Sequence, residues 1–181
     1  MKLSNPLIRI PAKYGAIGAT LVIILFYVLH FTDGNPLTDM NMFDFFILPI
    51  FLFFGMKEYR DIYNNKQLEF WQGMSTGFVV YVTLALITTL SLFLFLSVAA
   101  EQVFVDYVIN AVAEVTNNRD NTIERMGEEA YLEALSKTES TTKLDLVFDY
   151  LLKKLIVGLM LTIMISVIMR RKPLTASGEK S

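Results

Sequence analysis

Four stretches without a charged side chain constrain this chain more than any other feature. They cover residues 14–32, 45–56, 70–100 and 155–169, and contain 19, 12, 31 and 15 residues. A helix needs about 20 mostly apolar residues to cross the hydrocarbon core of a bilayer. The stretches therefore predict membrane-spanning helices, and the fold class that we expect is an all-α membrane protein.

Two of these stretches reach that length only with their neighbours. The second becomes a helix over 40–56 if Asp44 lies among the outer headgroups, and the fourth becomes 146–169 if Lys153 and Lys154 direct their ammonium groups to the interface. We therefore predict one membrane domain over residues 1–181 with spans at 14–32, 40–56, 70–100 and 146–169.

Two alternatives accompany this topology. The first stretch follows basic residues as a signal peptide does, but it is longer than the usual apolar core and lacks a small-residue cleavage pattern. The second stretch contains Pro49, which predicts a kink or, as the alternative, a re-entrant segment. We favour an uncleaved first span and a kinked second span.

The distribution of lysine and arginine predicts the orientation. Cytoplasmic flanks carry an excess of these residues. With four spans, 10 of the 16 lie on the side of the two termini and 6 on the other; a re-entrant second stretch changes the counts to 9 and 7. We therefore expect a multi-pass bacterial inner-membrane protein with both termini in the cytoplasm.

Composition excludes several classes of function. A net charge of −2 provides no basic field for nucleic acid. The chain has no cysteine and a single histidine, His30, so thiol catalysis and multi-histidine metal sites are excluded within one chain. No phosphate-binding, hydrolase or dinucleotide motif occurs. We expect no enzyme activity, no metal and no cofactor.

Residues 101–150 form the longest polar region, with 11 acidic and 4 basic side chains. Apolar residues at steps of three and four predict that the third span continues outward as an amphipathic helix. A second helix is expected from about 121 to 136, and Ser140, Thr141 or Thr142 would cap the fourth span. The segment 101–145 thus predicts a small outer helical hairpin, where a protein partner would bind. The Asn and Asp residues near 117–124 do not have the spacing of a calcium loop, so a capped turn is favoured there.

Gly73 and Gly77 form a G-x-x-x-G pattern at the inner end of the third span. Two glycines one turn apart allow a second helix to approach closely. We predict helix packing within one chain, with a homo-oligomer as the alternative. Gly15, Gly18 and Ala19 of the first span offer a complementary surface.

Ionisable residues in the middle of a span mark ion or proton paths, and the predicted spans contain none at that depth. Asp149 and Lys153 are four residues apart at the outer boundary, where they are expected to pair. Thr83, Thr88 and Ser91 in the third span can bond back to their own helix or line a path.

The inner connection has a recognisable pattern. Residues 55–61 read GMKEYRD, and residues 68–73 read LEFWQG. This pattern resembles a bacterial membrane family of unknown function, the domain-of-unknown-function family numbered forty-one ninety-nine. The order of a basic N-terminus, apolar spans, an acidic outer segment and a closing RRKP at 170–173 is also similar. The resemblance implies no known activity and no site residues.

Four residues of this connection are candidate inner interfacial or lipid contacts. The cations Lys57 and Arg60 suit anionic lipid, and Tyr59 and Trp71 suit the membrane interface. A structural anchor is the simpler interpretation, and a specific lipid or partner site is the alternative.

The function that we expect is that of a non-enzymatic scaffold, accessory or binding protein, with a small transporter or channel near the second and third spans as the alternative. A mid-depth cavity lined by Thr83, Thr88, Ser91 and Pro49 would favour transport. A tightly filled bundle with an exposed apolar groove on the outer helices would favour a binding role.

Overall fold

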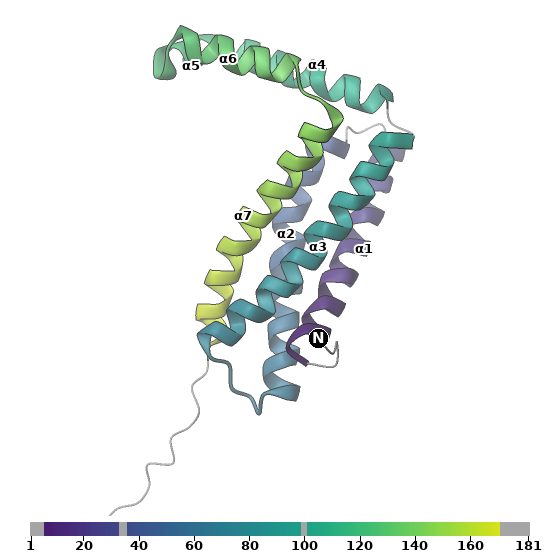
Figure 1. The fold of residues 1–181 in the computed structure, drawn as a ribbon, viewed down its shortest axis with the longest axis vertical. Coiled ribbons are helices and arrows are strands. Elements are labelled where there is room, and N and C mark those ends of the chain that lie inside the picture. Colours follow the sequence, from purple (N-terminus) through teal and green to yellow (C-terminus); the bar gives the residue numbers. More distant parts are fainter. Residues whose placement is uncertain (1–5, 33–35, 99–100, 171–181) are drawn as a thin grey trace, which may run out of the picture.

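The computed structural model describes residues 6–32, 36–98 and 101–170, and only the backbone at 36 and 38–45. These residues form α1 (Pro6–Phe31), α2 (Pro36–Glu58), the π-helical turn η1 (Tyr59–Tyr63), α3 (Phe70–Val98), α4 (Glu101–Asn117), α5 (Arg119–Met126), α6 (Glu128–Glu139) and α7 (Lys143–Met169). Helices α1, α2, α3 and α7 form a bundle, and α4, α5 and α6 lie across one end of it (Figure 1). We call α4 to α6 the cap, its end of the bundle the outer end, and the opposite end the inner end.

Three helices of the bundle are long and apolar enough to cross a membrane. Windows of α1, α3 and α7 have a mean hydropathy of 2.0, 2.4 and 2.2. Helix α2 is not among the helices that meet this measure, so the fourth span stays a prediction. It nevertheless runs unbroken past Pro49 and along the bundle (Figure 1).

Helix α3 is the centre of the bundle. Half of its most apolar window is buried, against 28% for α1 and 22% for α7. Its side chains join two apolar clusters, an inner one that includes Leu52, Met56 and Leu84 and an outer one that includes Phe26 and Leu92. The side chains of α1 and α7 that face away from α3 are left exposed, as in a helix that meets lipid on one side.

Glycines let the helices approach α3 on two different faces. A Cβ atom at Gly77 would lie 2.6 Å from Cε of Met56 and also against Thr162, and one at Gly73 would lie 2.9 Å from Oγ of Ser166. A Cβ at Gly15 would lie 2.6 Å from the carbonyl oxygen of Val80. The G-x-x-x-G pair therefore faces α2 and α7, whereas the small surface of α1 meets another part of α3.

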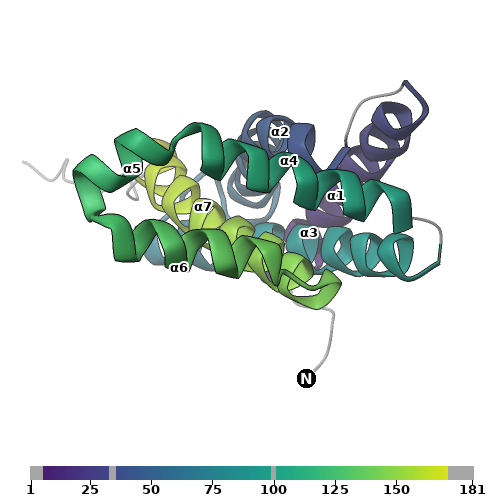
Figure 2. The same ribbon diagram turned by 90° about the horizontal axis from the view of Figure 1, so that it is seen from above.

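The cap differs from the sequence prediction in two ways. Helix α3 ends at Val98, and α4 runs across the outer end instead of extending α3 outward (Figure 1). The single helix expected near 121–136 is two helices, because Gly127 has φ +90° and ends α5. Seen from above, α4 and α6 run side by side (Figure 2).

Two predictions for the start of α7 are confirmed. Thr142 is the N-cap of α7 and forms a capping box with Asp145, whose carboxylate accepts the Thr142 N–H at 3.0 Å. Lys153 and Asp149 form an ion pair of 2.6 Å one turn further along. A second ion pair of 2.6 Å, between Lys143 and Glu101, joins the start of α7 to the start of α4.

Candidate functional site

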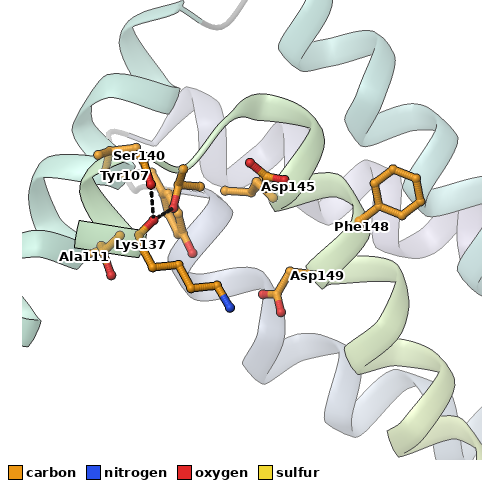
Figure 3. A pocket seen from close by; sticks show the side chains of 11 residues that line it. Tyr107, Ala111, Lys137, Ser140, Asp145, Phe148 and Asp149 are labelled. Carbon is orange, nitrogen blue, oxygen red and sulfur yellow. Dashed lines mark hydrogen bonds between the residues drawn. The ribbon is translucent and has the colours of Figure 1, made fainter. Parts of the chain in front are cut away.

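A pocket of about 640 Å³ lies in the angle between the cap and α7. Tyr107 and Ala111 line it from α4, Lys137 from α6, and Asp145 and Asp149 from α7. Figure 3 shows these side chains around one open space. Its volume is within the range of about 300–1,000 Å³ that is typical of small-molecule sites.

Both signs of charge are present at this pocket. The Lys137 side chain extends across it toward Asp149 (Figure 3). The Asp145 carboxylate accepts the hydroxyl hydrogen bond of Thr142 at 2.6 Å, which fixes its position at the helix end. The ion pair with Lys153 similarly holds Asp149, although the Asp149 side chain is still 53% exposed. These carboxylates can therefore accept further hydrogen bonds from a ligand.

Side-chain hydroxyl groups of the α6–α7 connection form hydrogen bonds to the backbone at the end of α6. The Ser140 and Thr141 hydroxyls donate to the carbonyl oxygen of Lys137 at 3.3 and 3.0 Å. This local bonding holds the rim of the pocket (Figure 3). Phe148, which is 68% exposed, forms the apolar side of the pocket on α7.

A second candidate lies inside the bundle, where the structure overturns a prediction. Lys154 does not reach the interface: it is 6% exposed, and its Nζ donates to Oγ1 of Thr88 at 2.8 Å. The same ammonium lies 4.3 Å from the centre of the Tyr150 ring. Lys154, Gly158, Thr162 and Ser166 repeat every four residues and share the buried face of α7. The direction of this face, which is set by α3, explains why Lys154 points inward.

The buried Lys154 is accommodated by hydrogen bonding. An ammonium group removed from water is costly unless polar groups replace its hydration. Thr88 donates its own hydroxyl hydrogen to the carbonyl oxygen of Leu84 at 2.9 Å, which orients the oxygen to accept from Lys154. Close to its middle, α3 is thus in contact with a buried ionisable side chain of α7. The pattern of charged residues in the sequence did not predict this contact.

The space beside this contact is small. A cavity of about 10 Å³ is lined by Thr88, Ser91 and three apolar residues of α1 and α3. Such a volume holds at most one water molecule. Thr83 and Pro49, which would belong to a predicted transport cavity, do not line it. Three other buried hydroxyls, those of Thr76, Thr89 and Thr162, have no hydrogen-bond partner within the described residues.

The four candidate residues of the inner connection are not brought together into one site. Tyr59 is 8% exposed and belongs to the inner apolar cluster, which corrects the expectation that it contacts lipid. Arg60 is half-buried and bonds Asp61 at 2.6 Å and the sulfur of Met169 at 3.7 Å. Lys57 is exposed beside the Phe53 ring. Trp71, 57% exposed, donates to Glu69. Tyr59 begins the π-helical turn and packs against the inner apolar cluster, which removes its ring from the lipid interface.

A further charged contact at the inner end involves Glu58, which is not among the four candidate residues. Glu58 accepts hydrogen bonds from Nζ of Lys13 at 2.7 Å and from the hydroxyl of Tyr14 at 2.6 Å. The hydrogen bond from Lys13, followed by that from Tyr14, holds the pKa of Glu58 below its usual value. This contact joins α1 to the end of α2.

Across residues 6–32, 36–98 and 101–170, no group of three or more His, Cys, Asp or Glu side chains is placed to hold a metal ion. His30 packs its ring 5.1 Å from the Phe95 ring at the outer end of the bundle. Asn118 and Asn121 lie on a separate open hollow of α5, together with Thr122, Arg125 and Met126. The pocket at the cap is therefore the candidate site with the most complete geometry.

Sequence reasoning missed both the pocket and the Lys154 contact. Tyr107 and Lys137 lie on different helices from Asp145 and Asp149, and no sequence motif links the four residues. Lys154 follows Lys153 directly and has the same local surroundings in the sequence. The one available signal was the repeat of small or polar residues every four positions after Lys154.

A comparison with protein families finds a match over most of the chain. The model of the family described as "Protein of unknown function (DUF4199)" matches residues 13–171. No curated protein and no solved structure matches the chain.

Proposed function

We propose that the protein, which belongs to the family DUF4199, is a non-enzymatic binding or accessory protein of the bacterial inner membrane. The function of this family is unknown, so membership in it provides no activity. The protein acts through the outer segment, and the observation that carries this proposal is the contrast between a very small cavity beside the buried Lys154 contact and an open pocket at the cap. The cavity beside Thr88 measures about 10 Å³, whereas the pocket between α4, α6 and α7 measures about 640 Å³. Binding at the cap is therefore favoured over passage through the bundle.

The topology that we propose has four spans with both termini in the cytoplasm. In support, α2 runs along the bundle beside α1, so that the described chain begins and ends at the inner end (Figure 1). Lys154 was counted among the Lys and Arg residues of the outer side. Because it is buried in the bundle, that number falls by one, and the excess of Lys and Arg on the inner side increases. Reporters fused after Asn118 and at Ser181 test it, and we expect signals from opposite sides. Signals from the same side would reject the topology.

The binding role is tested with a photoreactive residue placed in the pocket of the full chain in native membranes. Val108 lines the pocket, and its neighbour Ile109 is 59% exposed and is not among the residues that line it. We expect a defined adduct of one mass from position 108 and none from position 109. Equal adducts from both positions, or no adduct from either, would reject the binding role.

A small transporter is the second candidate, and the Lys154 contact is the observation that favours it. Ionisable groups within membrane helices often belong to proton or ion paths. If this protein conducts protons, liposomes that contain it should dissipate a pH gradient faster than empty ones, and Lys154→Met should abolish the difference. Dissipation at the rate of empty liposomes would reject this candidate.

A further inference from the structure

The pocket between the cap and α7 lies at the level where a lipid headgroup would be, if α7 crosses the membrane as proposed. About 20 residues of helix cross the hydrocarbon core. Counted outward from Met169, this length ends near Tyr150, one residue from Asp149. The charged residues of the pocket therefore lie just outside the hydrocarbon, between α6 and the start of α7. The cap runs across this end of the bundle (Figure 1).

An apolar stripe leads from the pocket along α7. Phe148, Leu152 and Ile156 follow one another every four residues and are 68%, 58% and 53% exposed. Residues spaced in this way share one face of a helix. Because Phe148 also lines the pocket, a headgroup held there would place its acyl chains along this stripe.

The charges of the pocket fit a headgroup that carries both signs. Lys137 suits a phosphate group, and the carboxylates of Asp145 and Asp149 suit an ammonium group. The surrounding segment 101–150 has 11 acidic and 4 basic side chains, which disfavours a lipid with a net negative charge. A primary ammonium can donate hydrogen bonds to the carboxylates, whereas a quaternary ammonium has no N–H to donate.

From these observations we infer that the pocket binds the headgroup of a zwitterionic phospholipid with a primary ammonium, such as phosphatidylethanolamine. The ammonium lies at Asp149 and Asp145, the phosphate at Lys137, and the acyl chains along Phe148, Leu152 and Ile156. This inference rests on the proposed function, because it names the ligand of the same pocket.

The inference is tested by native mass spectrometry of the full chain released from mixed micelles. The micelles contain equal amounts of phosphatidylethanolamine, phosphatidylcholine and phosphatidylglycerol. We expect the protein to retain the ethanolamine lipid about fivefold more than the choline lipid, the effect of one or two exposed charged hydrogen bonds. The glycerol lipid, which is anionic, should be retained least.

Two variants separate the two halves of the headgroup. Asp149→Asn should bring the ratio of ethanolamine to choline lipid clearly closer to one, because an amide oxygen accepts a weaker hydrogen bond from an ammonium than a carboxylate does. Lys137→Gln should lower the retention of both by about threefold and leave their ratio unchanged. Both side chains are exposed, so neither variant removes part of the core. Glu133→Gln, on the exposed surface of α6, and Lys57→Gln, at the inner end, are the matched controls and should behave as the wild type.

Several results would overturn the inference. Equal retention of the three lipids, preferred retention of the anionic lipid, or Asp149→Asn and Lys137→Gln variants that match the wild type would each do so. Displacement of the lipid by an equal concentration of free phosphoethanolamine would also overturn it, because the site would then select a soluble ligand. A protein adduct at position 108 without any lipid would support the binding role but overturn the lipid assignment, whereas the absence of every adduct would overturn both.

Discussion

The bundle and the cap are both helical, but they bury their side chains to very different extents. Each of α1, α3 and α7 has at least seven buried residues, whereas α4 and α5 have none and α6 has Tyr131 alone. Close packing makes the bundle sensitive to changes in volume. The cap has little core of its own. It is joined to the bundle by the ion pair between Lys143 and Glu101 and by Val103, Phe104 and Tyr107, which pack against the outer apolar cluster, and a pocket remains beside these contacts. We infer that the bundle provides most of the stability, whereas the cap contributes little buried core and leaves open the surface at which we propose binding.

The largest expected effect is on the bundle. Gly77→Leu would place a side chain against Met56 and Thr162, and overpacking of this kind costs about 3 kcal/mol. Thermal aggregation in detergent should therefore begin at a clearly lower temperature. Phe78→Leu is the matched control, because position 78 is 55% exposed and receives the same new residue. An unchanged aggregation temperature in Gly77→Leu would contradict the packing that we describe.

A smaller effect is expected at the polar contact inside the bundle. Thr88→Val removes the acceptor of the Lys154 hydrogen bond and should destabilise the protein by about 1–2 kcal/mol. In a Lys154→Met background the same change should cost much less, since no buried ammonium then loses its acceptor. Denaturation of the four proteins in a double-mutant cycle measures the difference. Equal costs in both backgrounds would show that the two side chains are not coupled.

At the boundary between the regions, Thr142→Ala should act locally. It removes the capping box at the start of α7 and should cost about 1 kcal/mol. Hydrogen exchange should increase in the first turn of α7 and at the rim of the pocket, but not in α3. Ser136→Ala, an exposed change on α6, is the control. Faster exchange throughout the bundle would mean that the cap and the bundle do not behave as separate regions.

The smallest effect concerns pH at the inner end. The pKa of Glu58 is lowered in the folded protein, so its contribution to stability is present above the unfolded pKa and is lost as the pH falls through the folded one. Glu58→Gln should therefore cost less than about 1 kcal/mol at pH 7, since the Lys13 side chain is 49% exposed. The difference from the wild type should narrow below about pH 4.5. A difference that is constant from pH 7 to pH 3 would reject the role of the charge.

Features that depend on a few neighbouring residues could be predicted from the sequence. The helix cap at Thr142 and the ion pair of Asp149 with Lys153 are of this kind, because both form within one turn of a helix. The membership of the chain in its family could also be predicted, from the residues of the inner connection.

Features that depend on the opposing helix could not be predicted. Lys153 and Lys154 are adjacent and identical in type, but one is exposed and the other lies between α7 and α3. Gly77 packs against α7 and α2, although α1 also has small residues that could have packed against it. The pocket needed three helices to meet, and its residues carry no common motif.

By itself, the sequence determined which segments are apolar enough to leave water and how the start of α7 is capped, because apolar content and capping are properties of a single segment. Only the tertiary structure decided which face of each helix is buried, how the cap lies across the bundle and where a pocket remains. The physical reason is that these features depend on the packing of surfaces from distant segments, and many pairings of apolar helices satisfy the same hydrophobic pattern.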